Sequence, residues 1–233
     1  MVRPTVILPG YLAGAAPYAK MAQTLEALGY PTRTVPLSRW DWLPTVGGRS
    51  MFPILQKLDA TVQALLQDTG ADQVNLVGHS AGGWIARIYM GETPYNVHRQ
   101  DHQRRQLWAA HPQVASLITL GTPHVSEERW TRRNLDFVNH NYPGAFEADV
   151  HYVCIAGKAI YGERSWTGWF TYNSYLITGG EGACWGDGIT PITAAHLERA
   201  KNLVLDQVYH SPRPGYRWYG SPEVVHQWAQ HLT

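Results

Sequence analysis

Short apolar runs alternate along the chain with stretches in which apolar residues recur every three or four positions. A continuous apolar run bounded by turn residues predicts a buried strand, and the longer spacing predicts a helix with one face on the core. Strands that alternate with helices are typical of a mainly parallel sheet, so the pattern predicts an α/β fold. The expected strands are residues 5–8, 32–36, 73–77, 116–120, 151–156 and 203–208, and the expected helices are 18–28, 52–66, 81–90, 193–200 and 224–231.

The whole chain, residues 1–233, is expected to fold as one doubly wound domain with a sheet of about six strands. Its 233 residues, 44% of them hydrophobic, are enough to bury a sizeable core. Two segments, near residues 92–113 and 157–186, are longer than simple connections need to be. Insertions of this kind commonly form lids or substrate walls, so we expect both to be lid-like.

The composition argues against several classes of function. A formal net charge of +1 disfavours nucleic acid as a partner, because duplex binding needs a clustered basic surface. The densest basic stretch, residues 99–105, is interrupted by Asp101 and is interpreted as a solvated helix face. The sequence contains no run of eighteen apolar residues, so no membrane-spanning helix is expected. Two cysteines, Cys154 in an apolar strand pattern and Cys184, and the lack of a leader pattern favour a cytoplasmic protein.

Aromatic residues are unusually frequent, with ten Trp and thirteen Tyr. They gather at residues 40–42, 166–175 and 218–219, mostly in expected loops. Loop aromatics line apolar substrate pockets or lipid-facing surfaces, and they also seal the edge of a core under long loops. Both interpretations stay open, and peripheral contact with lipid surfaces belongs to the first.

The string GHSAG at residues 78–82 matches the G-x-S-x-G pattern of a nucleophile elbow. It lies between the expected strand 73–77 and the expected helix 81–90, which is the context that such an elbow requires. In this strained turn the serine hydroxyl stands above the sheet edge, and side chains at the glycine positions would collide with their surroundings. The pattern predicts that Ser80 is a nucleophile.

A serine hydroxyl needs a histidine to take its proton and a carboxylate to orient that histidine. After a nucleophile elbow, the acid and then the histidine follow later strands in the chain. His210 stands just beyond the last expected strand and is the expected base. His196, His226 and His231 belong to expected helices and are weaker candidates.

The expected acid is Asp187, which lies between two glycines after the fifth expected strand. The glycines allow a tight turn that directs the carboxylate toward the histidine loop. Three other carboxylates stay open as alternatives. Asp206 is closer to the histidine in sequence but lies inside an expected strand, Asp149 precedes its strand, and Glu181 lies within the second insertion.

An oxyanion hole needs two backbone N–H groups held in place before the reaction. Ala81, directly after the nucleophile, is expected to supply one of them. The second is expected from the loop after the first strand, where Tyr11 supplies the donor and Gly10 permits a close approach. A simple turn at Pro9-Gly10 is the alternative interpretation.

Taken together, these motifs resemble the lipase branch of the α/β-hydrolase superfamily. The chain is similar to bacterial lipases and to glycosylphosphatidylinositol inositol-deacylase-like proteins, and its last motif resembles cyanobacterial and plastid members. The resemblance is carried by LPGY at residues 8–11, GHSAG at 78–82, LGTPH at 120–124, GDGITP at 186–191, YHSP at 209–212 and WYGSPEVVHQW at 218–228.

The resemblance implies ester hydrolysis by Ser80, Asp187 and His210, with Tyr11 and Ala81 as oxyanion donors. Two departures stand out. Many lipases have His-Gly where this chain has Pro-Gly at residues 9–10, and the first strands of the full fold are missing, as in minimal lipases. The histidine of LGTPH, at position 124, is interpreted as structural rather than catalytic or metal-binding.

One motif invites a metal interpretation. His98 and His102 are spaced to share a helix face with Asp101 nearby. No third ligand is evident, and the flanking arginines disfavour a cation. No phosphate-binding loop or dinucleotide fingerprint occurs, so neither a metal nor a cofactor is expected.

The sequence as a whole predicts a serine carboxylic-ester hydrolase that forms an acyl-enzyme with an ester of an apolar acid, from a small molecule or a lipid. The same three side chains can also transfer acyl groups to alcohols or cleave amides. A non-catalytic lipid-binding protein of the same fold is the further alternative.

Overall fold

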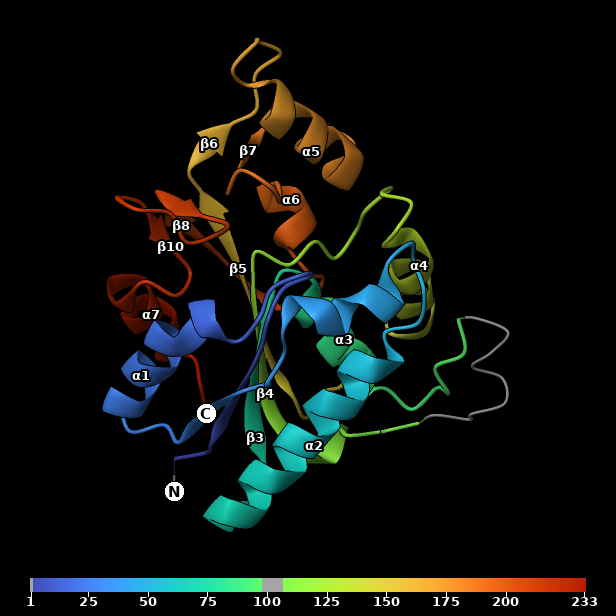
Figure 1. The fold of residues 1–233 in the computed structure, drawn as a ribbon, viewed down its shortest axis with the longest axis vertical. Coiled ribbons are helices and arrows are strands. Elements are labelled where there is room, and N and C mark those ends of the chain that lie inside the picture. Colours follow the sequence, from blue (N-terminus) through green and yellow to red (C-terminus); the bar gives the residue numbers. More distant parts are fainter. Residues whose placement is uncertain (1, 98–106) are drawn as a thin grey trace.

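The computed structural model describes residues 2–97 and 107–233, and its centre is a sheet of six parallel strands (Figure 1). From β1 the chain winds to one edge of the sheet, and from β3 onward it winds to the other edge. The α/β prediction with a doubly wound sheet is confirmed. The strand order is β2 (Thr32–Thr34), β1 (Thr5–Leu8), β3 (Val74–His79), β4 (Val114–Leu120), β5 (His151–Lys158) and β8 (Lys201–Asp206).

Along the chain, helices alternate with the strands, and in space they cover both faces of the sheet (Figure 1). Two pairs of short strands, β6 (Ile160–Tyr161) with β7 (Trp185–Gly186) and β9 (Val208–Tyr209) with β10 (Arg217–Trp218), lie outside the main sheet. The helices are η1 (Ala16–Tyr18), α1 (Ala19–Ala27), η2 (Arg39–Thr45), α2 (Phe52–Thr69), α3 (Ala81–Met90), η4 (His111–Gln113), α4 (Arg132–Asn141), α5 (Trp169–Gly179), α6 (Ile192–Ala195) and α7 (Pro222–Ala229).

The core consists of two apolar clusters, one on each face of the sheet. Successive side chains of a strand point to opposite faces, so Leu76 belongs to one cluster and Val77 to the other. The first cluster packs under α2 and α3, and the second packs under α1 and α7 (Figure 1). Strands β3 and β4 are buried along their whole length. The carboxyl ends of these strands are therefore enclosed by the core, which fixes the points from which the following loops begin.

Most expected elements differ from the observed ones by one to a few residues at their ends, and for two of them the structure shows the local cause. The predicted helix at 193–200 is wrong beyond residue 195, because His196 is extended and the Asn202 side chain binds both the N–H and the carbonyl of Leu197, at 3.0 and 2.9 Å. The predicted strand at 203–208 begins at Lys201 and ends at Asp206. The positive φ of 58° at Gln207 turns the chain out of the main sheet there.

The two expected insertions differ in how far the structure describes them. In the second, β5 continues to Lys158, and the remaining residues form β6, α5 and β7 beyond the carboxyl ends of the strands (Figure 1). Part of the first, residues 98–106, lies outside the described residues, as does the expected basic helix face at 99–105. Within residues 2–97 and 107–233, no helix combines the length and apolar character that a membrane crossing requires.

Candidate active site

The turn between β3 and α3 holds Ser80 in a strained backbone conformation. Its φ of 52° and ψ of −125° lie in a region that residues with a side chain rarely adopt. The glycines two positions before and after it are required by packing. A Cβ on Gly78 would lie 2.5 Å from Gly83 Cα, and a Cβ on Gly82 would lie 2.4 Å from Leu8 O. The local geometry is that of an elbow with Ser80 at its apex.

Ala81, the first residue of α3, directs its N–H out of the helix. The first N–H groups of an α-helix have no partner within the helix. The carbonyl of the same peptide group, Ser80 O, accepts from Gly83 N–H at 3.1 Å. In a trans peptide the N–H points opposite to the carbonyl, so the Ala81 N–H is directed away from this first helical turn.

The loop after β1 is fixed against the same elbow. Gly10 N–H donates to the Tyr18 hydroxyl at 2.9 Å, and Gly10 O accepts from Ala13 N–H at 3.0 Å. Both peptide groups that flank Gly10 are thereby oriented, and Tyr11 N–H points opposite to the bonded Gly10 carbonyl. A Cβ on Gly10 would lie 3.0 Å from Ser80 Cβ, so this loop lies directly against the serine.

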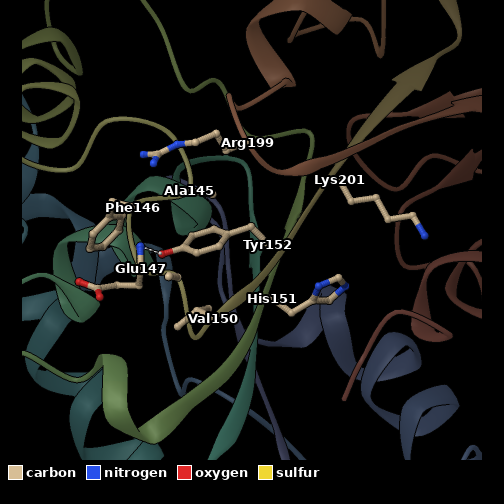
Figure 2. Close-up of a pocket in the computed structure, with 9 residues that line it drawn as sticks. Ala145, Phe146, Glu147, Val150, His151, Tyr152, Arg199 and Lys201 are labelled. Atoms are coloured by element: carbon tan, nitrogen blue, oxygen red, sulfur yellow. Dashed lines mark hydrogen bonds between the residues drawn. The ribbon is translucent and has the colours of Figure 1, made fainter.

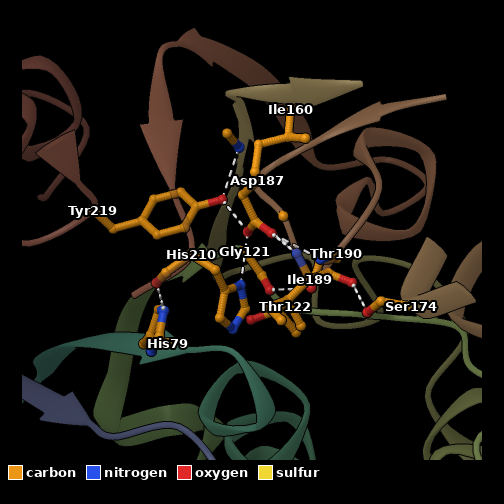
Figure 3. Close-up of polar contacts among 12 residues, drawn as sticks. His79, Gly121, Thr122, Ile160, Ser174, Asp187, Ile189, Thr190, His210 and Tyr219 are labelled. Carbon is orange, nitrogen blue, oxygen red and sulfur yellow. Dashed lines mark hydrogen bonds and ion pairs between the residues drawn. The ribbon is translucent and has the colours of Figure 1, made fainter. Parts of the chain in front are cut away.

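His210 and Asp187 form a buried pair (Figure 3). His210 follows β9, and its Nδ1 donates to Asp187 Oδ2 at 2.7 Å. A backbone hydrogen bond from His210 N–H to Asp187 O, 3.0 Å long, joins the same two loops. Because an ionised carboxylate only accepts hydrogen bonds, the proton of the neutral ring is on Nδ1 and Nε2 carries the lone pair. The ring can therefore accept a proton on the side opposite Asp187.

The carboxylate of Asp187 is held on both of its oxygens. Oδ1 accepts from the N–H groups of Ile189 and Thr190, at 3.0 and 2.7 Å, in a turn that the neighbouring Gly188 permits with its φ of 101°. Burial on its own raises the pKa of Asp187, but His210 and the two N–H donors outweigh burial, so the pKa lies below the ordinary carboxyl value. Asp187 therefore stays ionised at neutral pH.

Tyr219 completes the surroundings of Asp187, and sequence reasoning did not identify it. Its hydroxyl accepts from Gly157 N–H at 2.7 Å and donates to Asp187 Oδ2 at 2.8 Å (Figure 3). Burial, and then the charge of Asp187, raise the pKa of Tyr219 well above its ordinary value, so the hydroxyl remains a donor. Gly121 makes room on the other side, since a Cβ there would lie 2.6 Å from Asp187 Oδ2. The sequence signals for Tyr219 were its place in the motif at 218–228 and in the aromatic group at 218–219, and neither indicated a contact with the acid.

His79, the residue before the serine, also contacts the histidine loop. Its Nε2 lies 2.9 Å from His210 O, and its Nδ1 lies 2.8 Å from the Tyr18 hydroxyl. The His79 and His210 ring centroids are 4.9 Å apart. Burial, reinforced by the neighbouring His210, lowers the pKa of His79 to about 3. In the sequence His79 occupies a variable position of the elbow motif, and nothing there marked it or Tyr18 as part of the site.

The alternative acids lie away from His210. Asp206 is exposed at the end of β8, with its Oδ1 3.9 Å from Lys158 Nζ. Asp149 is exposed before the first residue of β5, at the opposite end of the strand from the site, and Glu181 is exposed beyond α5.

The alternative histidines have other partners or surroundings. His226 is exposed, with its Nδ1 2.6 Å from Pro222 O, and His231 Nδ1 lies 3.4 Å from Lys201 Nζ. His196 is half-buried in the extended segment after α6. Among the histidines weighed from the sequence, it is His210 that binds Asp187.

His124 belongs to the core rather than to the site. Its Nδ1 lies 3.3 Å from an amino nitrogen of the buried Arg87, and its Nε2 lies 3.3 Å from Thr119 Oγ1 and 3.6 Å from Cys154 Sγ. Cys154 is a buried free thiol, as its apolar strand pattern predicted. These contacts agree with the interpretation of His124 as a structural residue.

Metal ligands do not gather in the part of the chain that the structure describes. Among residues 2–97 and 107–233, no three His, Cys, Asp or Glu side chains are grouped as a metal ion would require. The motif formed by His98, Asp101 and His102 lies outside the described residues.

A pocket of about 430 Å³ lies at the opposite end of the sheet from Ser80, near the first residues of β5 and β8 (Figure 2). The ring of Tyr152 lies beside that of Phe146, with ring centroids 6.1 Å apart. Its two cationic side chains do not converge. Arg199 donates to Pro143 O at 3.0 Å, and Lys201 points away from the pocket toward His231.

Exposed aromatic side chains gather in and just before α5. Trp166, Trp169 and Phe170 are 98%, 64% and 62% exposed. The helix is tied to the Asp187 loop, because the Tyr175 hydroxyl accepts from Gly188 N–H and Ser174 Oγ donates to Ile189 O, both at 2.8 Å. The exposed aromatic residues thus belong to the same segment that binds the Asp187 loop.

Known structures share the fold along the full chain. A Bacillus licheniformis lipase is 19% identical, with a TM-score of 0.63 over 100% of this chain and 92% of that chain. A Lactobacillus plantarum carboxylesterase is 15% identical, with a TM-score of 0.53 over 99% and 83% of the two chains. A Paleococcus ferrophilus monoacylglycerol lipase is 11% identical, with a TM-score of 0.50 over 99% and 97%. These similarities establish the α/β-hydrolase fold.

Comparison with curated protein sequences gives no match. A profile of the lecithin:cholesterol acyltransferase family, in contrast, matches residues 5–140. The matched segment runs from β1 to α4 and includes the loop after β1 and the Ser80 elbow, whereas Asp187 and His210 lie beyond it. Because this segment is more than half of the 233 residues, the chain belongs to the lecithin:cholesterol acyltransferase family.

Proposed function

We propose that the protein is a serine carboxylic-ester hydrolase that works through an acyl-enzyme on esters of apolar acids. The observation that carries this proposal is the buried pair of His210 and Asp187, with Nδ1 and Oδ2 2.7 Å apart. The backbone carbonyl of His210 is in turn bonded to His79, the residue before Ser80. A histidine oriented by a carboxylate and a serine on a strained turn are the parts that such chemistry needs.

In the proposed reaction Ser80 Oγ attacks the ester carbonyl carbon, and its proton passes to Nε2 of His210. Asp187 stabilises the resulting imidazolium. When the carbon–oxygen bond to the alcohol breaks, His210 gives the proton to the leaving oxygen, and the acyl group stays on Ser80. A water molecule then attacks the acyl-enzyme while His210 takes its proton. As the bond between the acyl carbon and Ser80 Oγ breaks, His210 returns that proton to Ser80 Oγ, which releases the acid and restores the serine.

The negative oxygen of the tetrahedral intermediates would accept hydrogen bonds from Tyr11 and Ala81 N–H. Two observations support this choice. The Gly10 N–H is already bonded to Tyr18, which leaves the next N–H of the loop for the substrate. The carbonyls of Gly10 and Ser80 are both bonded within their turns, so the N–H groups on the other side of each peptide need no reorganisation during the reaction.

The exposed aromatic residues of the α5 segment support an apolar acyl group and peripheral contact with a lipid surface. Large exposed apolar patches are rare on soluble proteins, and where they occur they commonly mark an interaction site. The similarity to lipases gives only the fold, so chain length and headgroup are left to experiment.

The decisive experiment combines active-site labelling with hydrolysis. A fluorophosphonate probe should label the wild-type protein at Ser80, identified by mass spectrometry, and Ser80→Ala should abolish labelling and lower kcat by at least about 10³-fold. p-Nitrophenyl esters from acetate to palmitate should show kcat/KM rising with acyl length. Absence of labelling together with vesicle binding would instead indicate a non-catalytic lipid-binding protein.

A second candidate, acyl transfer, is favoured by the family to which the chain belongs. The same acyl-enzyme would be attacked by an alcohol instead of water, with His210 again taking the proton. Adding a long-chain alcohol to the assay should then yield a new ester at the expense of free acid. An amine acceptor in a parallel reaction, and peptide substrates, test the amide chemistry of the same side chains.

A further inference from the structure

Three loops of the site are joined by one chain of hydrogen bonds. Gly10 N–H bonds to the Tyr18 hydroxyl at 2.9 Å, that hydroxyl bonds to His79 Nδ1 at 2.8 Å, and His79 Nε2 bonds to His210 O at 2.9 Å. Tyr18 and His79 are 2% and 4% exposed. This chain of hydrogen bonds therefore runs through the protein interior, from the loop after β1, through the elbow, to the histidine loop.

The direction of every proton in this chain follows from its ends. Gly10 N–H can only donate, and the carbonyl of His210 can only accept. His79 must therefore donate from Nε2, which leaves Nδ1 to accept from the Tyr18 hydroxyl. With Nδ1 protonated instead, Nε2 and the carbonyl oxygen would be two acceptors facing each other. One tautomer of a neutral His79 satisfies all three bonds.

Aromatic rings pack around this chain of hydrogen bonds. Trp218 packs edge-on against Tyr18 and against His79, with ring centroids 5.6 and 5.8 Å apart. Tyr219, the donor to Asp187, also lies against His79, at 5.8 Å. A buried ring with fixed bonds at both nitrogens cannot rotate without leaving polar groups unpaired, which costs free energy.

We propose that Tyr18 and His79 are positioning residues that set the oxyanion loop and the histidine loop at fixed places around Ser80. This inference rests on the proposed function, because it assigns the two side chains to the same reaction. They touch no reacting atom. Tyr18 orients the peptide groups around Gly10, and His79 holds the backbone of His210, so their effect is on the placement of the oxyanion donor and of the base.

The first test removes one oxygen atom. Tyr18→Phe keeps the ring and leaves Gly10 N–H and His79 Nδ1 unpaired. Since small displacements of reacting groups are costly, kcat should fall by about 10- to 100-fold, with KM changed by less than about threefold. The rate of Ser80 labelling by a fluorophosphonate, which also needs the oxyanion donors, should fall in parallel.

Tyr142→Phe is the matched control. The Tyr142 hydroxyl is also bonded to a backbone N–H, that of Thr93 at 2.9 Å, in a buried ring beyond the far end of α3. Both variants should lose thermal stability, but Tyr142→Phe should keep kcat within about twofold of wild type. Equal losses of kcat in the two variants would overturn the proposal, because the effect of Tyr18 would then be general destabilisation.

His79 is tested with a pair of substitutions and a spectroscopic readout. His79→Gln retains a side-chain amide that can donate to His210 O, whereas His79→Phe cannot, so His79→Gln should retain at least about tenfold more kcat. In the wild-type protein, ¹⁵N NMR of the histidine rings should show His79 neutral, with Nε2 protonated and Nδ1 not. A protonated Nδ1 would overturn the proposal.

The two proposals fail separately. If wild type hydrolyses no ester and no probe labels Ser80, the proposed function is wrong, and the His79 tautomer no longer concerns catalysis. If wild type is active and labelled while His79→Phe and Tyr18→Phe keep full kcat, the function stands and the positioning role is wrong.

Discussion

At the scale of single residues, the site depends on a buried carboxylate whose two oxygens are both held by donors. Asp187 receives donors from Ile189, Thr190, His210 and Tyr219, so its charge is stabilised without contact with water. A buried carboxylate with fewer donors would take up a proton or move. Tyr219 thus belongs to the chemistry of the acid, and its ring also lies against His79, the residue before Ser80.

Replacing Tyr219 with Phe tests this role. The change removes one donor from Asp187 Oδ2 and the acceptor of Gly157 N–H, so we expect a loss of about 1–3 kcal/mol in unfolding free energy and a kcat roughly tenfold lower. Tyr89→Phe is the matched control, because the buried Tyr89 also donates to a carboxylate, that of Asp59 at 2.9 Å. A kcat as low in Tyr89→Phe would count against a specific role for Tyr219. Urea unfolding and steady-state kinetics supply both numbers.

At the scale of elements, the site is assembled at the carboxyl ends of β1, β3, β4 and β5, and α5 stands above it (Figure 1). Trp166, Trp169 and Phe170 are exposed, whereas Ser174 and Tyr175 are bonded to the Asp187 loop. The aromatic residues at the start of the segment are therefore available to an apolar partner, and the residues further along the helix bind the loop of the site.

The double substitution Trp166→Ser with Trp169→Ser tests the exposed aromatic residues at the start of the α5 segment. Both side chains are more than half exposed, so stability should change by less than about 0.5 kcal/mol. Hydrolysis of p-nitrophenyl palmitate in mixed micelles and binding to phosphatidylcholine vesicles should fall several-fold, while hydrolysis of soluble acetate stays unchanged. The double substitution Trp40→Ser with Leu43→Ser, in η2, is the control for loss of exposed apolar surface elsewhere. Equal losses for both double variants would deny α5 a specific role.

At the scale of the whole molecule, burial of neutral imidazoles links stability to pH. Burial lowers the pKa of His79 to about 3 and the pKa of His124 well below its ordinary value. In the unfolded chain both take up a proton near pH 6.5, as free histidines do. Below about pH 6.5 the unfolded state therefore binds more protons than the folded state, and stability falls as the pH falls toward the folded values.

The expected loss is up to about 1.4 kcal/mol per pH unit for each of the two imidazoles. Urea unfolding at intervals between about pH 7.5 and pH 5 measures it. His79→Gln should be less stable at neutral pH but should show a shallower slope, by up to one proton. A free energy of unfolding that is equal at pH 7.5 and pH 5 would contradict the account.

The pattern of apolar residues determined the α/β class and most strand and helix positions, and the string GHSAG between a strand and a helix determined the elbow, because each of these depends on neighbours in sequence. Chain order and local turn residues also selected Asp187 and His210, the two side chains that the structure finds bonded. The bounds of α6 and β8 were not predictable, since they depend on the Asn202 side chain and on the turn at Gln207.

Only the tertiary structure decided which side chains support the site. Tyr18, His79 and His210 are separated by 61 and 131 positions along the chain, and no local periodicity connects them. They meet because parallel strands carry their carboxyl ends to one edge of the sheet, where loops distant in sequence become neighbours. Buried polar groups must then find partners across that edge, and the partners are chosen by packing rather than by local sequence.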